Sequence, residues 1–471
     1  MKFAVWSKIM AANARMNMTE GPLFRKILTY TLPVLGTGVL QFLYNSADTV
    51  IVGRFAQDGE TALAAVGSTG SLSALITGLF IGLSVGANVS ISHDYGAGKD
   101  DQVKHTVHTS VLLSAILGVL ISLFGFFTAE PLLSLMGVPE TVLGQSTIYM
   151  RTIFLGMPAQ MAYNYGAAII NARGDTRRPF YFLLVSGALN VGLNFIFVTI
   201  FHLDVLGVAL ATIISQYLSA FLVLRHLARL EDSCKLFITR LYIHRGKLLK
   251  IIKIGVPAGI QGCMFSISNV LIQSSINSFG SATMAANTAA ANVDGLIYIA
   301  MNSFYHAALA FSGQNAGALR FDRVKKACIE CLSSSFIVGL VVGASCYAFG
   351  PILLGLFGVE GDAETNEIMR VGMQRLLIVG VPYCICGLME VMSGMLRGMG
   401  ASLVAAISSL VGICLFRVVW IYTVFAEYNS IEVLYLSYPV TWIITTAAHT
   451  VCFIIILRNR KKTFGITEVK L

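Results

Sequence analysis

The feature that most constrains this chain is a series of long apolar segments separated by short polar connections. A helix needs about 20 apolar residues to cross a hydrocarbon layer of about 30 Å, and in lipid only helices and closed barrels satisfy every backbone hydrogen-bonding group. Hydrophobic residues make up 56% of the 471 residues and charged residues only 12%. We therefore expect an all-α integral membrane protein with twelve transmembrane helices. They are predicted at residues 28–52, 62–86, 103–127, 145–170, 179–201, 205–228, 250–276, 283–311, 326–349, 370–393, 402–425 and 433–457.

The basic residues are distributed unevenly around these segments. Most of the 33 Lys and Arg residues fall before the first helix, after the last helix, or in the connections that follow even-numbered helices. Because connections rich in Lys and Arg stay in the cytoplasm, both termini are expected to be cytoplasmic in a multi-pass protein of the cell (plasma) membrane. The net charge of +9 then reflects topology and requires no nucleic-acid partner. The five exceptions are Arg54, Arg151, Arg370, Arg375 and Arg417.

The second half of the chain repeats the first. The segment from Lys26 to Pro33 matches the segment from Lys250 to Pro257 at an offset of 224 residues, and later elements keep nearly the same offset. Each half has six predicted helices, so the repeats are parallel. This predicts two pseudosymmetric six-helix lobes around a central cleft, which suits alternating access. The expected parts are a cytoplasmic N-terminal segment (1–25), an N-lobe (26–228), a cytoplasmic linker (229–249), a C-lobe (250–457) and a basic cytoplasmic tail (458–471).

Asp48 stands alone in the first apolar segment. Residues 29–53 contain no Lys or Arg and no other carboxylate. A charge at that depth is costly, so such residues usually face a protein interior or a water-filled cavity, where they bind an ion, a proton or a substrate. The alternative is a carboxylate that reaches the membrane surface or caps a break in the helix.

Further polar residues lie within later segments. Asn190 and Asn194 are four residues apart and share one helix face, as two ligands of a site require, although amides also hydrogen-bond between helices in membranes. Asp294 and Glu390 are acids within predicted helices 8 and 10. Together with Asp48 they predict an acidic interior that favours cationic substrates. Arg417 in predicted helix 11 could neutralise either of the two later acids, which is the structural alternative to a coupling role for them.

Several short motifs follow one another along the chain: Pro33, Gln41, Asp48-Thr49 and Gly53, then Gly156-x-Pro158 and Arg173-Gly-Asp-Thr176, with most of them repeated in the second half. The order of these motifs resembles that of the multidrug and toxic compound extrusion (MATE) family. The resemblance covers about residues 26–457 and implies an antiporter that exports organic cations or drugs in exchange for H⁺ or Na⁺, with no other cofactor.

The resemblance also implies roles for individual residues. Asp48 stands where the family has its acid in the first helix, which takes part in binding the coupling ion. Asn190-x-x-x-Asn194 stands where many members have Asn-x-x-x-Asp, so this chain lacks the second acid. That loss favours protons over sodium, because sodium needs more fixed oxygen ligands. The expected coupling site is Asp48, Asn190, Asn194 and Thr212, and the expected substrate cavity includes Gln41, Asn164, Asp294 and Glu390.

Other functional classes fit the sequence less well. A flippase for lipid-linked saccharides, from the same fold superfamily, is the alternative, but such chains resemble fourteen-span proteins with a more basic cavity. The predicted helices contain no nucleophile–His–acid set, metal-ligand cluster or phosphate-binding loop, which argues against an enzyme. A twofold lobe repeat with isolated acids argues for a carrier over a channel. We expect the protein to act as a monomer in the lipid bilayer.

Overall fold

The computed structural model describes residues 16–56, 58–357 and 367–465. The first fifteen residues of the expected N-terminal segment and the last six of the tail lie outside this range. The described chain is helical, with short connections. In the first half the helices are α2 (Leu23–Phe55), α3 (Gly59–Gly96), α4 (Asp100–Leu135), α5 (Glu140–Leu155), α6 (Met157–Ala172), α7 (Arg177–Phe195), the π-helical turn η1 (Ile196–Ile200) and α8 (Asp204–Ala228).

The second half begins after the 3₁₀ turn η2 (Ile238–Arg240) of the linker and contains more interruptions. Its elements are α9 (Arg245–Asn277), α10 (Ser281–Gly317), α11 (Phe321–Ala348), α12 (Gly350–Leu356), α13 (Glu367–Arg375), η3 (Leu376–Gly380), α14 (Tyr383–Gly398), α15 (Ser402–Ser409), η4 (Leu410–Leu415), α16 (Phe416–Trp420), η5 (Ile421–Phe425), α17 (Ala426–Tyr428) and α18 (Ile431–Thr463). The segments η3, η4 and η5 are π-helical and continue their helices.

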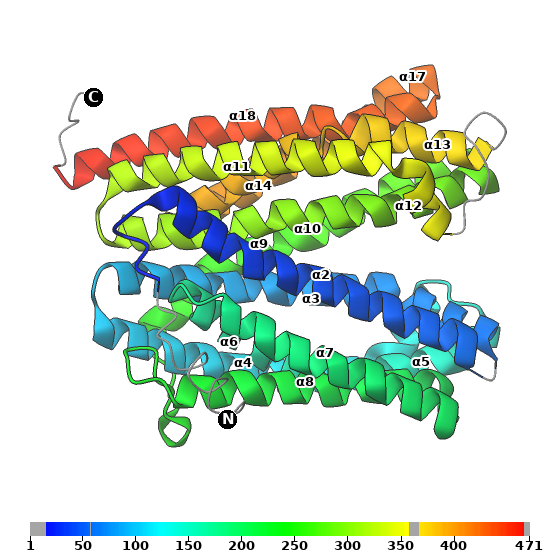
Figure 1. Ribbon diagram of the computed structural model, residues 1–471, viewed down its shortest axis with the longest axis horizontal. Coiled ribbons are helices and arrows are strands. Elements are labelled where there is room, and N and C mark those ends of the chain that lie inside the picture. Colours follow the sequence, from blue (N-terminus) through cyan, green and yellow to red (C-terminus); the bar gives the residue numbers. More distant parts are fainter. Residues whose placement is uncertain (1–15, 57, 358–366, 466–471) are drawn as a thin grey trace, which may run out of the picture.

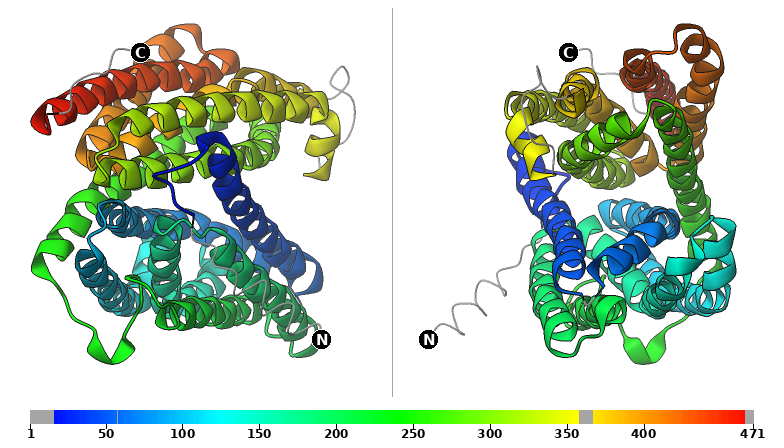
Figure 2. Two further views of the ribbon diagram at one scale, coloured as in Figure 1. Left: turned by 60° about the vertical axis from the view of Figure 1, so that its left-hand side comes forward. Right: turned by 90° about the vertical axis from the view of Figure 1, so that its right-hand side faces the viewer.

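The predicted transmembrane helices correspond to these elements in order. Within the described residues, ten helical stretches are long and apolar enough to cross a membrane. The fourth predicted helix is the pair α5 and α6, which meet at Gly156. The eighth is α10, whose sequence includes Asn287, Asn292 and Asp294 and is therefore less apolar. Most helices of the first half gather in one lobe and most helices of the second half in the other, while α2 and α9 pack against helices of both halves (Figures 1 and 2).

The two lobes meet along glycine-rich helix faces. A Cβ atom on Gly82 of α3 would lie 2.3 Å from the Cα of Gly259 in α9, and one on Gly86 would lie 2.2 Å from a carbonyl oxygen of α9. Small residues at four-residue spacing allow two helix backbones to approach this closely. Gly70, nearer the start of α3, has no atom within 4 Å of its Cβ position. The close contact thus begins near the middle of α3.

The seam continues to the end of the bundle that carries most of the Lys and Arg residues, which we call the basic end. There α3 and α10, the second helices of the two repeats, make reciprocal contacts. A Cβ on Gly96 would lie 2.0 Å from the carbonyl oxygen of Gln314, and one on Gly317 would lie 2.0 Å from that of His93. In addition, Asp94 of α3 forms a buried ion pair with Lys247 of α9 at 2.7 Å.

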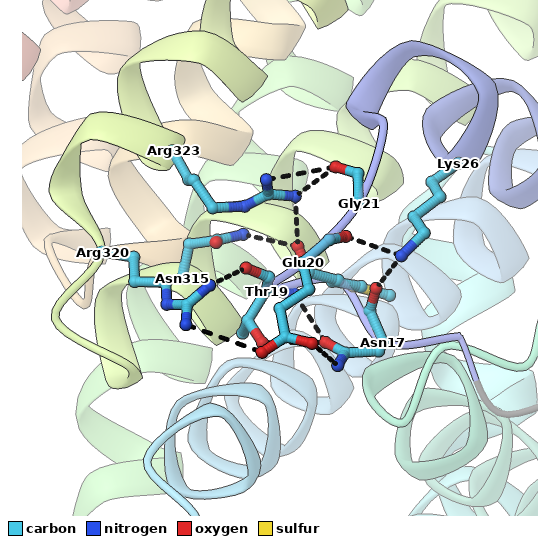
Figure 3. A network of polar contacts seen from close by, with 9 residues as sticks. Asn17, Thr19, Glu20, Gly21, Lys26, Asn315, Arg320 and Arg323 are labelled. Atoms are coloured by element: carbon cyan, nitrogen blue, oxygen red, sulfur yellow. Dashed lines mark hydrogen bonds and ion pairs between the residues drawn. The ribbon is translucent and has the colours of Figure 1, made fainter.

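The segment before α2, residues 16–21, lies across this seam (Figure 3). Its backbone carbonyl oxygens accept hydrogen bonds from the C-lobe: Arg320 donates to that of Thr19 at 2.6 Å, and Arg323 donates to that of Gly21 at 3.1 Å. The Met18 side chain is fully buried. On the other side, Gly174 of the N-lobe approaches the segment so closely that a Cβ would lie 2.7 Å from the Met16 carbonyl oxygen. The lobes are therefore joined at the basic end.

Candidate functional site

Asp48 is the centre of a polar cluster inside the N-lobe. The Asn194 amide donates a hydrogen bond to Oδ1 of Asp48, and the Thr212 hydroxyl lies 3.5 Å from Oδ2. Asn190 completes the cluster, because its amide donates to Thr212 at 3.4 Å and its carbonyl oxygen accepts from Asn194 at 3.3 Å. The structure thus brings together the four residues predicted for the coupling site. They come from three helices, α2, α7 and α8.

The local structure explains how α7 presents two amides to one carboxylate. Asn190 and Asn194 are both buried on the same face, one turn apart. Immediately after them, the helix changes to the π-helical turn η1. Such turns inside helices are frequent at functional sites, since they shift the register of the side chains that follow.

No cationic side chain in the described chain forms an ion pair with Asp48. Its two oxygens are contacted only by neutral groups, an amide and a hydroxyl. A carboxylate of this kind can exchange a proton without breaking an ion pair. The neighbouring amide and hydroxyl can reorient to hydrogen-bond either the ionised or the protonated carboxyl group. The cluster is chemically suited to reversible protonation, and its role in coupling stays a prediction.

The two other N-lobe residues predicted for the cavity are not hydrogen-bonded to this cluster within the described residues. Gln41 is exposed on α2, and Asn164 is half-buried on α6. They remain candidates for substrate contact only.

In the C-lobe, Asp294 of α10 is paired with Arg375 of α13. Two guanidinium nitrogens of Arg375 lie 2.9 and 3.0 Å from Oδ2 of Asp294, and both side chains are buried. Arg375 also donates to the Asn287 carbonyl oxygen at 2.5 Å, and Asn287 donates to Gln273 of α9 at 2.8 Å. This network was missed by the sequence argument, although an arginine within a predicted transmembrane segment was itself a signal.

The structure contradicts one alternative and one prediction about the C-lobe charges. Arg417 does not neutralise Asp294, which pairs with Arg375, nor does it pair with Glu390. The interior is also not acidic throughout, because the C-lobe buries three arginines, Arg375, Arg397 and Arg417, against the two acids. Arg417 was considered from the sequence as a partner for these acids, but Arg375 and Arg397 were not expected to be buried beside them.

Glu390 is buried on α14, and no ion pair or hydrogen bond of its carboxylate is found among the described residues. The nearby Arg397 uses its guanidinium for other partners: it donates to the hydroxyl of Tyr305 at 2.7 Å and to the side-chain oxygen of Gln261 at 2.6 Å. Glu390 therefore remains a candidate for the substrate cavity. Unlike Asp294, it forms no ion pair with an arginine among the described residues.

Comparison with known protein families shows which family this chain belongs to. A family model described as MatE matches residues 33–196 and 257–423, so that its two matches begin at Pro33 and Pro257. The matches cover well over half of the chain and fall one in each half. The chain belongs to the MATE family of transporters. As a MATE protein it is an ion-coupled, multi-pass membrane transporter and not an enzyme.

Relatives and solved structures agree with this assignment. A probable multidrug resistance protein of Bacillus subtilis (strain 168), YoeA, is 28% identical over 431 residues, which cover 90% of this chain and 91% of the relative. A FAD transporter of Shewanella oneidensis is 25% identical over 74% of this chain and 77% of its own length. An outward-facing structure of a multidrug resistance MATE family transporter superimposes with a TM-score of 0.85 at 22% identity, covering 94% of this chain and 98% of that one. This structural match confirms the predicted fold class.

Proposed function

We propose that this MATE transporter exports drug-like organic compounds from the cell in exchange for protons that bind at Asp48. In this proposal the basic end faces the cytoplasm, which agrees with the positive-inside rule. Relatives named as probable multidrug resistance proteins support the substrate class. One relative is named a FAD transporter, so organic anions also belong to the range of compounds to be considered.

The observation that carries the proposal is the Asp48 cluster. A single carboxylate contacts two neutral side chains and has no counter-charge in ion-pair contact within the described chain. Protonation removes the charge from the membrane interior, while deprotonation restores a site that attracts a cation. One group can therefore bind a proton from one side of the membrane and release it to the other.

The contacts between the two lobes define which surfaces must separate during alternating access. The lobes are joined from Gly82 of α3 to the ion pair of Asp94 and Lys247. Opening the basic end requires separation of these contacts, and closing the opposite end requires the lobes to rock about the same line. Proton binding at Asp48 would couple to this motion through α2, which packs against both α7 and α10.

Transport by Asp48→Asn protein in proteoliposomes tests the proposal. Asparagine resembles the protonated carboxylic acid, so the variant should fold but lose gradient-driven export of a fluorescent organic cation. The matched control is Asp58→Asn, an exposed acid that caps the start of α3 and should transport normally. Proton and sodium gradients are collapsed separately. Transport by Asp48→Asn at the wild-type rate would refute the role of Asp48, and transport sustained by sodium alone would refute proton coupling.

The flippase alternative is favoured by one observation, the buried arginines of the C-lobe, because guanidinium groups suit phosphate-bearing lipids. The twelve predicted helices favour the drug exporter. Translocation of a lipid-linked saccharide by the same proteoliposomes, with no applied ion gradient, would support the flippase instead.

A further inference from the structure

The C-lobe contains a buried cation with no ion-pair partner. Arg417 of α16 is 4% exposed, and within the described residues no carboxylate forms an ion pair with it. Among the described residues it donates one hydrogen bond, to the Asn269 side-chain oxygen of α9 at 3.1 Å, and its Nε atom is buried without a hydrogen-bond partner there. Burying an unpaired charge costs several kcal/mol, so this arrangement needs an explanation.

Aromatic contact compensates Arg417 only in part. Its guanidinium carbon lies 4.2 Å from the ring centroid of Tyr438 in α18. The same ring is also contacted by Arg375, at 5.5 Å. A cation–π contact contributes about 0.5–2 kcal/mol, which is less than the cost of burying the charge. Because Asp294 balances only Arg375, one positive charge beside Tyr438 remains unbalanced.

The position of Arg417 is equivalent, by the internal repeat, to the position of the N-lobe cluster. In the N-lobe, Asp48, Asn194 and Thr212 come from α2, α7 and α8. The matching contacts of the C-lobe join α9, α16 and α18, which are the first, fifth and sixth helices of the second repeat. At the offset of 224 residues, Arg417 aligns with the residue directly before Asn194.

π-Helical turns occur at equivalent places in the two lobes. The N-lobe turn η1 follows Asn194, and the equivalent turn η5 follows Arg417 by four residues. A second π-helical turn, η4, directly precedes α16. Arg417 therefore lies on a five-residue helix between two π-helical turns, a local structure that is frequent at functional sites.

We propose that Arg417 forms a binding subsite for an oxyanion, the carboxylate or phosphate group of a transported organic compound. The guanidinium offers several N–H donors in a planar fork, which suits both groups, and its Nε–H is unused. The exposed Asn269 amide is placed to contribute a further donor. The two lobes then provide equivalent sites of opposite charge. This inference rests on the proposed function, because it names a class of compound that the transporter carries.

Equilibrium binding of two flavins to purified protein in detergent tests the subsite. Riboflavin 5′-phosphate and riboflavin share one fluorescent ring system and differ by the phosphate group alone. The wild-type protein should bind the phosphorylated compound about tenfold more tightly or better, as expected for hydrogen bonds to charged groups. Arg417→Gln should abolish this preference, and Arg417→Lys should keep part of it. Arg151→Gln is the matched control, since Arg151 pairs with Glu130 at an exposed position.

Several outcomes would overturn the inference. Equal affinity of the wild-type protein for the two flavins would do so without any variant, which keeps the test decisive even if Arg417→Gln does not fold. A phosphate preference that persists in Arg417→Gln would place the subsite elsewhere. Displacement of the phosphorylated flavin by inorganic phosphate at equal concentration would show a site for free anions. Because no gradient is applied, failure of proton coupling at Asp48 would leave these binding results unchanged.

Discussion

Gly82→Ala should shift the transporter away from the state in which the basic end is closed. The new Cβ would lie 2.3 Å from the Gly259 Cα, whereas carbon atoms in contact are about 3.5–4.0 Å apart, so α3 and α9 must separate by about 1.2–1.7 Å. Overpacking of this kind costs about 1–3 kcal/mol. Since a tenfold change in an equilibrium constant corresponds to about 1.4 kcal/mol, the ratio of closed to open protein should fall by roughly fivefold to a hundredfold.

Distances between spin labels at the basic end measure this shift. Exposed positions Arg177 in the N-lobe and Lys326 in the C-lobe are suitable, in a background without the nine native cysteines. Gly70→Ala is the matched control, because it lies on the same helix and has no atom within 4 Å of its Cβ position. Alanine favours helix formation by about 1 kcal/mol over glycine in both variants and in both states, so this term cancels. If Gly82→Ala and Gly70→Ala gave the same distance distribution, the steric argument would be wrong.

Two further predictions concern the basic end. In the same spin-label experiment, Asp94→Asn should increase the open population about tenfold or more, because it leaves Lys247 buried without its ion-pair partner. The control is Asp101→Asn, which breaks only an exposed ion pair with Lys104 and should change nothing measurable. A cysteine at the exposed linker position Thr239 should react with an impermeant reagent only after cells are permeabilised, and labelling of intact cells would reverse the proposed orientation.

Helix number and order could be predicted from the sequence because each crossing of a membrane requires its own apolar segment. Even α10 was found, since its flanks remain apolar despite Asn287 and Asp294. The interruptions were not predictable in the same way. The break at Gly156 divides one predicted helix into α5 and α6, and the π-helical turns depend on contacts with neighbouring helices. A hydropathy pattern contains no information about such contacts.

The N-lobe cluster was predictable and the C-lobe network was not, for a physical reason. Asp48 is alone in its segment, and Asn190 and Asn194 share a helix face by spacing alone, so both signals are local. The partner of Asp294 is Arg375, 81 residues away, and that pairing is decided by how α13 packs against α10. The sequence shows that both charges are present in the membrane, but only the packing of the helices decides which arginine neutralises which acid.

The two repeats keep the same backbone contacts while their interiors differ, and sterics explains why. Gly96 and Gly317 each face a carbonyl oxygen at a distance that allows no Cβ, so both copies of the seam require glycine whatever is transported. An interior site has no such restriction, since a polar group there needs only a partner or a ligand. The N-lobe can therefore hold a carboxylate, Asp48, while the equivalent helices of the C-lobe hold a guanidinium, Arg417. One rocking motion about a symmetric seam can then act on two chemically different loads, a proton in one lobe and an anionic group in the other.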